Sequence, residues 1–440
     1  MTVRDVNLFA EANTQKFARQ GQMLKRHITI DGFSTESKLR IERGQASGLS
    51  GWWHSYLAGR RPTSLNPQAR ELRTLDLFAG AGGLALGLRQ ATDECGFIAR
   101  SIAAVDEDLG ALEVYRQNHE TSLILNDSVS MLVNFQLSGA GDDATFFGRP
   151  SVAPKLAHLI GSLDVVLAGP PCQGHSNFNN HSRRDDHRND LYLTVPAMAV
   201  ALEIPMVIIE NVPGVIHDHR SVVNSTISLL QKSGYRVTFG VHDAAALGWP
   251  QTRKRFFLIA SRDVMPIEVG TVASALAAES TLPVTWALNC TATIHGDSFM
   301  DELPAISPEN QRRVNFLFDN ELHELPNSER PECHREGTTY KSVYGRMWAD
   351  QPAPTLTAGF LSPGRGRFTH PTEPRALKPR EAARVQGFPN NYVFGLANGA
   401  PPRTHLAKWI GNAVPMPLGF AAALSLLLPR VTHTEQVSRR

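Results

Sequence analysis

The stretch Asp76-Leu77-Phe78-Ala79-Gly80-Ala81-Gly82-Gly83-Leu84 decides the fold of this 440-residue chain. It begins at the end of an apolar run with strand composition, and its glycines lead into a segment of helical spacing at residues 84–91. Glycines let the backbone approach a ligand closely, and the N-terminus of the helix that follows favours a phosphate or carboxylate. The stretch therefore predicts a nucleotide-type pocket between a strand and a helix.

The same alternation of short apolar runs and helical stretches continues to about residue 261. It predicts an α/β fold with a Rossmann-like, mostly parallel sheet, in which ligands bind beyond the carboxyl ends of the strands. Asp106 closes the second run, where it is placed to bind ribose hydroxyls, so AdoMet and NAD both fit this part of the pattern. The expected strands cover residues 75–78, 102–105, 163–168, 206–209, 235–241 and 256–260, and the expected helices 84–91, 109–118 and 191–202.

Changes in composition divide the chain. Residues 1–70 carry eleven Lys/Arg against five Asp/Glu in helix-like and polar stretches, and form a basic extension before the main domain at 71–262. DNA affinity, a dimer contact and packing onto the main domain are all consistent with this extension. Residues 263–374, rich in Pro, Gly and Thr, predict a second, smaller domain; 375–430 return to the main domain, and 431–440 form a tail.

The overall composition is that of an ordinary globular protein, with 42% hydrophobic residues, 20% charged residues and a formal net charge of +2. The whole-molecule charge does not by itself indicate a polyanionic partner, although local arginine clusters are compatible with a phosphate backbone. The four cysteines are widely spaced without zinc-site spacing, so we expect no metal and a reducing compartment. No charged-then-apolar leader or span of roughly 20 apolar residues is evident, and we expect a cytoplasmic, nucleoid-associated protein.

Four further motifs carry chemistry, although each is ambiguous alone. Cys172, in Gly-Pro-Pro-Cys-Gln-Gly-His-Ser at 169–176, follows a buried strand and is either a nucleophile or an inert free thiol. Glu210 ends another strand and suits either catalysis or helix capping. Arg253 and Arg255, in Gln-Thr-Arg-Lys-Arg, alternate onto one side of a strand, and Gly-Asn-Ala-Val-Pro at 411–415 precedes the last helix.

Together, these motifs closely resemble those of the C5-cytosine DNA methyltransferase family, over most of residues 73–425. The matching segments, in order, are DLFAGAGGL, GPPCQGHS, ENV, QTRKR, REAARVQGFP and GNAVP. The resemblance implies transfer of a methyl group from AdoMet to C5 of a flipped cytosine in a specific duplex sequence, through a covalent bond between Cys172 and C6. It also implies a role in restriction-modification or phage defence, a monomer on DNA, and a cognate nuclease as a possible partner.

The resemblance assigns roles residue by residue. Asp106 stands where the family more often has Glu, and His175 where it commonly has Phe. The second domain occupies the place of the family's target-recognition domain. The implied catalytic residues are Cys172, Glu210, Arg253 and Arg255; the implied cofactor residues are Phe78, Gly80, Gly82, Gly83, Asp106, Asp127 and Asn412; and the implied DNA contacts are Gln173, Ser176, Arg346, Arg365 and Arg367.

Three other functions remain open at this point. One branch of the family methylates tRNA on the same scaffold, although the sizeable segment at 263–374 favours duplex DNA. A non-catalytic DNA-binding regulator is expected to lose the nucleophile or the acid, whereas Cys172 and Glu210 are both present. An NAD oxidoreductase fits only the glycine-rich turn.

Overall fold

The computed structural model describes residues 13–171, 191–218, 221–290, 298–335 and 342–432. Its centre is a seven-stranded sheet in the order β14-β15-β13-β12-β5-β6-β7. Neighbouring strands pair in parallel except at β15, which runs antiparallel to both β13 and β14. This is the mostly parallel α/β sheet that the alternation predicts. Its strands are β5 (Glu71–Leu77), β6 (Ile98–Asp106), β7 (Leu123–Asn126), β12 (Val165–Ala168), β13 (Met206–Asn211), β14 (Arg236–Asp243) and β15 (Lys254–Ser261).

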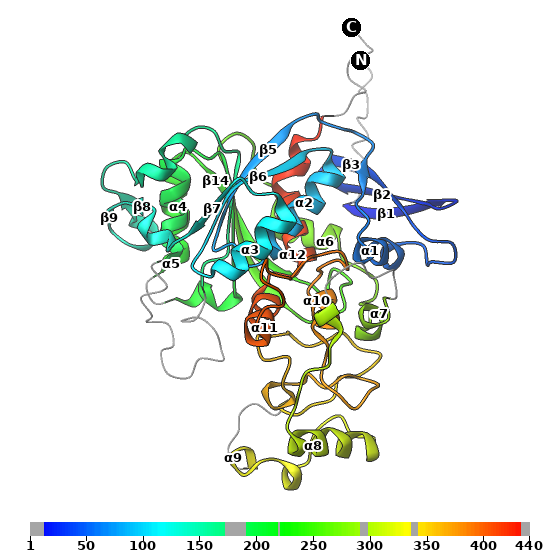
Figure 1. Ribbon diagram of the computed structural model, residues 1–440. Coiled ribbons are helices and arrows are strands. Elements are labelled where there is room, and N and C mark those ends of the chain that lie inside the picture. Colours follow the sequence, from blue (N-terminus) through cyan, green and yellow to red (C-terminus); the bar gives the residue numbers. More distant parts are fainter. Residues whose placement is uncertain (1–12, 172–190, 219–220, 291–297, 336–341, 433–440) are drawn as a thin grey trace, which may run out of the picture.

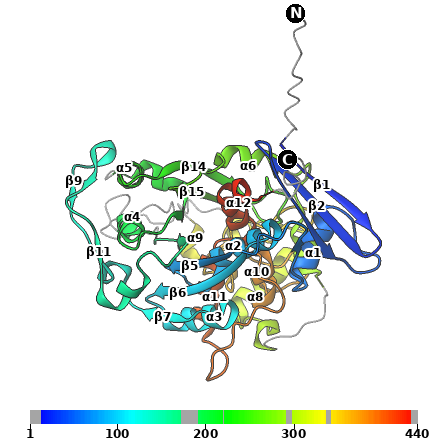
Figure 2. The same cartoon turned by 90° about the horizontal axis from the view of Figure 1, so that it is seen from above.

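Helices cover both faces of this sheet, which makes three layers (Figure 2). Successive side chains of a strand point to opposite faces, so Val165 and Leu167 of β12 pack on one side and Val166 and Ala168 on the other. All four are fully buried, which explains the continuous apolar run. One face carries α2 (Gly83–Cys95), α3 (Leu109–His119), α6 (Val269–Ala275) and α12 (Met416–Leu427), and the other carries α4 (Leu191–Ala201) and α5 (Val222–Lys232).

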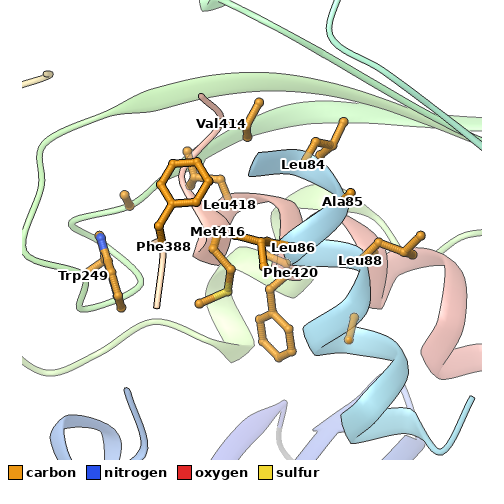
Figure 3. Close-up of a cluster of buried hydrophobic side chains, with 14 of the residues drawn as sticks. Leu84, Ala85, Leu86, Leu88, Trp249, Phe388, Val414, Met416, Leu418 and Phe420 are labelled. Atoms are coloured by element: carbon orange, nitrogen blue, oxygen red, sulfur yellow. The ribbon is translucent and has the colours of Figure 1, made fainter. Parts of the chain in front are cut away.

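Helices α2 and α12 pack backbone against backbone. A Cβ added to Gly87 would lie 2.5 Å from the carbonyl carbon of Gly419, so only glycine permits this approach. Leu84, Leu88 and Phe420 fill the space around the crossing (Figure 3). The run Arg403–Arg430 is apolar and long enough to cross a membrane, yet 89% of its most apolar window is buried inside the structure, as expected of a core helix.

The N-terminal region forms an antiparallel sheet that the sequence analysis did not predict. The sheet contains β1 (Thr14–Gln20), β2 (Met23–Ile30), β3 (Phe33–Arg40) and β4 (Thr63–Ser64), and α1 (Leu49–Leu57) lies beside it. The N-terminal region packs onto the main domain through α1. The Tyr56 hydroxyl donates to the Gly387 carbonyl at 3.0 Å, and the Trp53 ring meets that of Phe420 edge-on at 5.8 Å. Packing, one of the three roles left open for residues 1–70, is therefore present in the part that the structure describes.

A buried ion pair links this N-terminal sheet to α2. Arg26 Nη1 lies 3.2 Å from Glu94 Oε1, and the two side chains are only 2% and 0% exposed. Burial lowers the pKa of Arg26 and raises that of Glu94, and the attraction between the two charges opposes both shifts. Gln90 also donates to Glu94, at 2.6 Å. The pair thus holds the C-terminal end of the helix whose N-terminal end follows the glycine-rich turn.

The second lobe lies on the opposite side of the molecule from the N-terminal strands and the upper part of the sheet (Figure 1). It contains α8 (Pro308–Asp319) and α9 (Glu332–Arg335) and has its own apolar cluster around Leu317 and Val343. However, α6 contacts β14 and α12, and α7 (Val284–Leu288) contacts α10 (Pro379–Val385). These helices belong with the main domain, so the lobe begins after α7, later than the predicted boundary at residue 263.

We expect Arg26→Met to lower the free energy of unfolding by about 3–5 kcal/mol, because it leaves a buried carboxylate without its partner. The adjacent Lys25 is a matched control, since its pair with Glu36 is exposed and Lys25→Met should cost less than about 1 kcal/mol. Urea unfolding of both variants measures the difference. Equal effects of the two substitutions would contradict a stabilising role for the Arg26–Glu94 pair.

Candidate active site

A cavity of about 980 Å³ opens at the carboxyl edge of the parallel strands. Leu77 pairs with Ala168 and Ala168 pairs with Ile209, so the residues that follow these strand positions stand side by side. These residues are Phe78, Gly169 and Glu210, and all three line the cavity. Further walls come from Asp106 and Glu107 after β6, Asp127 after β7, Arg253 and Arg255 at the start of β15, and the end of α11 (Arg403–Asn412).

The glycine-rich turn has an unusual backbone that is held from two sides. Phe78, Gly80 and Gly82 have positive φ angles of 56°, 51° and 85°. The Gly80 amide donates to Asp106 Oδ2 at 2.9 Å, and a Cβ on Gly83 would lie 2.7 Å from the Val414 carbonyl oxygen. The turn therefore packs between β6 and the segment that follows α11. Phe78, Gly80 and Gly83 line the cavity.

Gly82 is not among the residues that line the cavity. It is the residue before the first turn of α2, and its left-handed φ of 85° favours glycine. A Cβ there would lie 2.4 Å from His119 Nε2 and 2.8 Å from the Tyr392 hydroxyl. Close packing therefore explains why this position favours glycine, and the predicted cofactor contact stays a prediction.

Three acidic residues surround the turn. Asp76 is 1% exposed, burial raises its pKa well above the ordinary range, and its Oδ2 has no hydrogen-bond partner among the described residues. Burial also raises the pKa of Asp106, while the backbone amides of Asp108 and Gly80 oppose this shift. Asp127 lines the cavity and forms an ion pair with Lys155. The cavity therefore offers carboxyl acceptors beside the glycines.

Glu210 and Arg255 form a close pair in the wall of the cavity. Arg255 Nε lies 2.7 Å from Glu210 Oε1, and the side chains are 14% and 10% exposed. Burial raises the pKa of Glu210, and the positive charges of Arg255 and Arg253 oppose the rise. A carboxyl with a raised pKa beside a guanidinium can hold or share a proton near neutral pH.

Arg253 also lines the cavity, but its guanidinium mainly contacts backbone. Its Nη1 donates to the carbonyls of Leu356, at 2.5 Å, and Gly411, at 3.1 Å, and the residue is 3% exposed. It thereby ties β15 to two later segments of the chain. Cys172, Gln173, His175 and Ser176 lie outside the described residues; Pro170 and Pro171, which precede them directly, line the cavity.

The three arginines predicted to contact DNA differ in their surroundings. Arg365 is exposed at the end of a short turn of helix, Pro363–Arg365. Arg367 is buried, where it donates to the His323 carbonyl at 2.7 Å and stacks 4.1 Å from the centre of the Trp348 ring. Arg346 donates to the Pro371 carbonyl and lies over the Phe318 ring. Arg367 and Arg346 hold the lobe together through these contacts, whereas Arg365 is exposed.

Comparison with known proteins agrees with this geometry. The family model for C-5 cytosine-specific DNA methylase matches residues 72–427. The chain belongs to this family. Type II methyltransferase M1.BsuMI of Bacillus subtilis is 38% identical over 376 residues, which cover 85% of this chain and 84% of that protein. Type II methylase M.HgiDII of Herpetosiphon aurantiacus is 30% identical over 362 residues, covering 80% and 94%.

A solved structure supports the fold. The S. pombe Dnmt2 methyltransferase superimposes with a TM-score of 0.53 at 16% identity, and the match covers 83% of this chain and all of that one. The predicted family and fold class are therefore confirmed. The chain is a DNA cytosine-5 methyltransferase, and its relatives include bacterial Type II enzymes.

Sequence analysis missed one wall of this methylase's cavity. His405, Lys408 and Trp409 of α11 line it together with the predicted Asn412. Asp108 accepts hydrogen bonds from Lys408 Nζ at 3.1 Å and from Trp409 Nε1 at 3.0 Å, which joins α11 to the start of α3. His405, Lys408 and Trp409 stand seven, four and three positions before Asn412, and this spacing predicts that all four residues share one face of a helix.

Removing Arg255 should make stability depend on pH. Arg255→Met takes away a charge that opposes the raised pKa of Glu210, so this pKa rises further above its unfolded-state value. Stability that is present below the unfolded-state pKa is then lost as the pH rises through the folded-state pKa. We expect urea unfolding to show a larger loss of stability at about pH 8 than at about pH 5. Adding Glu210→Gln should abolish this difference; a difference that persists would point to another group.

Proposed function

We propose that this methyltransferase uses AdoMet to methylate C5 of a flipped cytosine in a specific sequence of double-stranded DNA. The observation that carries the proposal is a single cavity that joins the glycine-rich turn to the buried Glu210–Arg255 pair. A cofactor beside the glycine-rich turn and a cytosine base beside Glu210 would thus share this cavity, whose wall includes Pro171, the residue before Cys172 in the sequence. We also propose that the enzyme acts in the cytoplasm, on nucleoid DNA.

The cavity suits AdoMet in size and in the chemistry of its donor set. Its volume of about 980 Å³ accommodates a nucleoside-sized ligand together with a base. Packing at Gly83 leaves no room for a side chain there, and Asp76, a buried carboxyl in the cavity wall whose pKa burial raises, offers an acceptor to N–H donors of the ligand. We assign Phe78 to the adenine, Asp106 to the ribose and Asp127 to the adenine edge, with Gly80, Gly83 and Asn412 completing the wall. Bound AdoMet supplies an electrophilic methyl group.

The protein's part in the chemistry is to make C5 nucleophilic. The Cys172 thiolate adds to C6 of cytosine, so that the ring electrons move toward C5, which then takes the methyl group. Glu210 holds a proton at N3 and the exocyclic amine and thereby stabilises the charge that develops on the ring. Arg255 binds the O2 edge, and the cations near the cavity favour the thiolate. Methyl transfer would leave the cofactor as its neutral thioether, which keeps the electrons of the broken bond. Solvent water then takes the C5 proton, the electrons of the C5–H bond re-form the C5–C6 double bond, and the Cys172 thiolate leaves C6, which restores the aromatic ring.

Duplex DNA is the favoured substrate. A stacked base cannot present C6 to a thiol, so the cytosine must leave the helix and enter the cavity. The second lobe supplies a surface for recognition, and we assign DNA contact within it to Arg365. Arg346 and Arg367 act instead as supports of that surface. Gln173 and Ser176 remain proposed DNA contacts beside the nucleophile.

The relatives favour one biological setting over others. M1.BsuMI and M.HgiDII are Type II enzymes, which supports modification of DNA beside a restriction nuclease. Methyl incorporation into duplex DNA but not into tRNA would separate this function from tRNA methylation. Covalent trapping on DNA that carries 5-fluorocytosine would exclude a non-catalytic regulator, because trapping requires both attack and methyl transfer.

We expect Cys172→Ser to abolish 5-methylcytosine formation from labelled AdoMet and duplex DNA, because a hydroxyl is a poor nucleophile here. Glu210→Gln should lower kcat by about 100-fold, since it keeps the shape of Glu210 but cannot exchange the same proton. Both variants should bind AdoMet as the wild type does. Methylation by Cys172→Ser at the wild-type rate would overturn the mechanism.

We expect Arg365→Ala to weaken DNA binding by roughly tenfold without changing the melting temperature. Arg312→Ala is a matched control, because Arg312 is an exposed arginine of the same lobe whose side chain pairs with Glu329. Fluorescence anisotropy over a salt series measures both variants. A smaller salt slope for Arg365→Ala would indicate a phosphate contact and a relaxed sequence preference a base contact; unchanged affinity would rule out either.

A further inference from the structure

The segment that joins α11 to α12 shapes one side of the cavity. Asn412, Ala413 and Val414 all line it, and the Val414 carbonyl presses against Gly83 of the glycine-rich turn. The carbonyls at the C-terminal end of a helix have no partners within the helix, so the end of α11 needs donors from elsewhere. We refer to residues 411–414 as the cavity turn.

Gln386 supplies such donors. It is 1% exposed, and its Nε2 lies 2.7 Å from the Ile410 carbonyl oxygen, 3.2 Å from that of Gly411 and 3.3 Å from that of Ala413. Its own backbone carbonyl accepts from the Met416 amide at 3.2 Å. A single residue thus contacts the chain both before and after the cavity turn.

Two further contacts fix the same turn. Arg253 Nη1 donates to the Gly411 carbonyl at 3.1 Å and to that of Leu356 at 2.5 Å. A Cβ on Gly411 would lie 2.3 Å from the carbonyl carbon of Thr357, so the turn lies directly against that backbone. The cavity turn is therefore held by Gln386 at the end of α10, by Arg253 before β15 and by the backbone of Thr357.

We propose that Gln386 is a positioning residue for cofactor binding, which caps α11 and keeps the cavity turn in the shape that receives AdoMet. Gln386 is not among the residues that line the cavity, and it acts through Asn412 and Val414, which are. When only a fraction of the molecules holds the competent shape, the apparent dissociation constant rises by the inverse of that fraction. The inference rests on the proposed use of AdoMet.

The test compares two substitutions of buried glutamines. Gln386→Met keeps the length of the side chain and removes the donor to the three carbonyls. Gln90→Met removes a similarly buried amide that donates to Glu94, at the far end of α2 from the cavity. Calorimetric titration of the full chain with AdoMet, thermal unfolding, and steady-state kinetics on duplex DNA are measured for both variants and for Gln386→Asn.

We expect Gln386→Met to raise the Kd and the KM for AdoMet by about tenfold, while kcat at saturating AdoMet stays within about twofold of the wild type. Gln386→Asn, whose amide is one methylene shorter, should give an intermediate Kd. Gln90→Met should lower the melting temperature and leave the Kd unchanged.

Several outcomes would overturn the inference. If the wild-type protein binds AdoMet and Gln386→Met has the same Kd, the inference is wrong and the proposed function stands. Equal losses of affinity in Gln386→Met and Gln90→Met, or failure of both Gln386 variants to fold, would show that the role is only structural. If the wild-type protein did not bind AdoMet, the proposed cofactor would fail and the inference would fail with it.

Discussion

The site depends first on the parallel register of β5, β12 and β13. Leu77, Ala168 and Ile209 lie at one level across three strands, so the chain leaves the sheet at neighbouring points. All three are fully buried between two helical layers, so a slip by one residue would exchange the side chains that pack against the two layers. The packing of the core therefore sets where the glycine-rich turn, the loop before Cys172 and Glu210 meet.

The antiparallel direction of β15 completes the site. Parallel strands bring only their carboxyl ends to this edge, whereas an antiparallel strand begins there. This is why Glu210, near the end of β13, meets Arg255, near the start of β15. Glu210, in the motif at the end of β13, and Arg255, in the motif at the start of β15, therefore face the same cavity.

Sequence reasoning succeeded where burial leaves a continuous signal. The central strands β12 and β13 are buried on both faces, and six of the seven strands lie where composition predicted them. Strand β7 was not predicted, because it has four residues and only one of them is buried. Strands β1 to β3 were missed because residues such as Lys16 and Lys38 face outward and break the apolar runs. The direction of β15 was also out of reach, since local composition is the same for either direction. Gly82 and Arg367 were predicted to contact ligands. The structure shows internal packing of both, and residue type alone does not tell a contact with a ligand from a contact with the chain.

The electrostatic state of Glu210 connects the fold to the proposed chemistry. Burial raises the pKa of Glu210, and the positive charges of Arg255 and Arg253 oppose that rise. A cytosine that fills the cavity excludes water, and this desolvation raises the pKa of Glu210 further. If Arg255 at the same time shares its donors with the O2 edge of the base, its stabilisation of the carboxylate weakens. Both changes favour a proton on Glu210 only when cytosine is in place, which couples the charge state that the reaction needs to the arrival of the substrate.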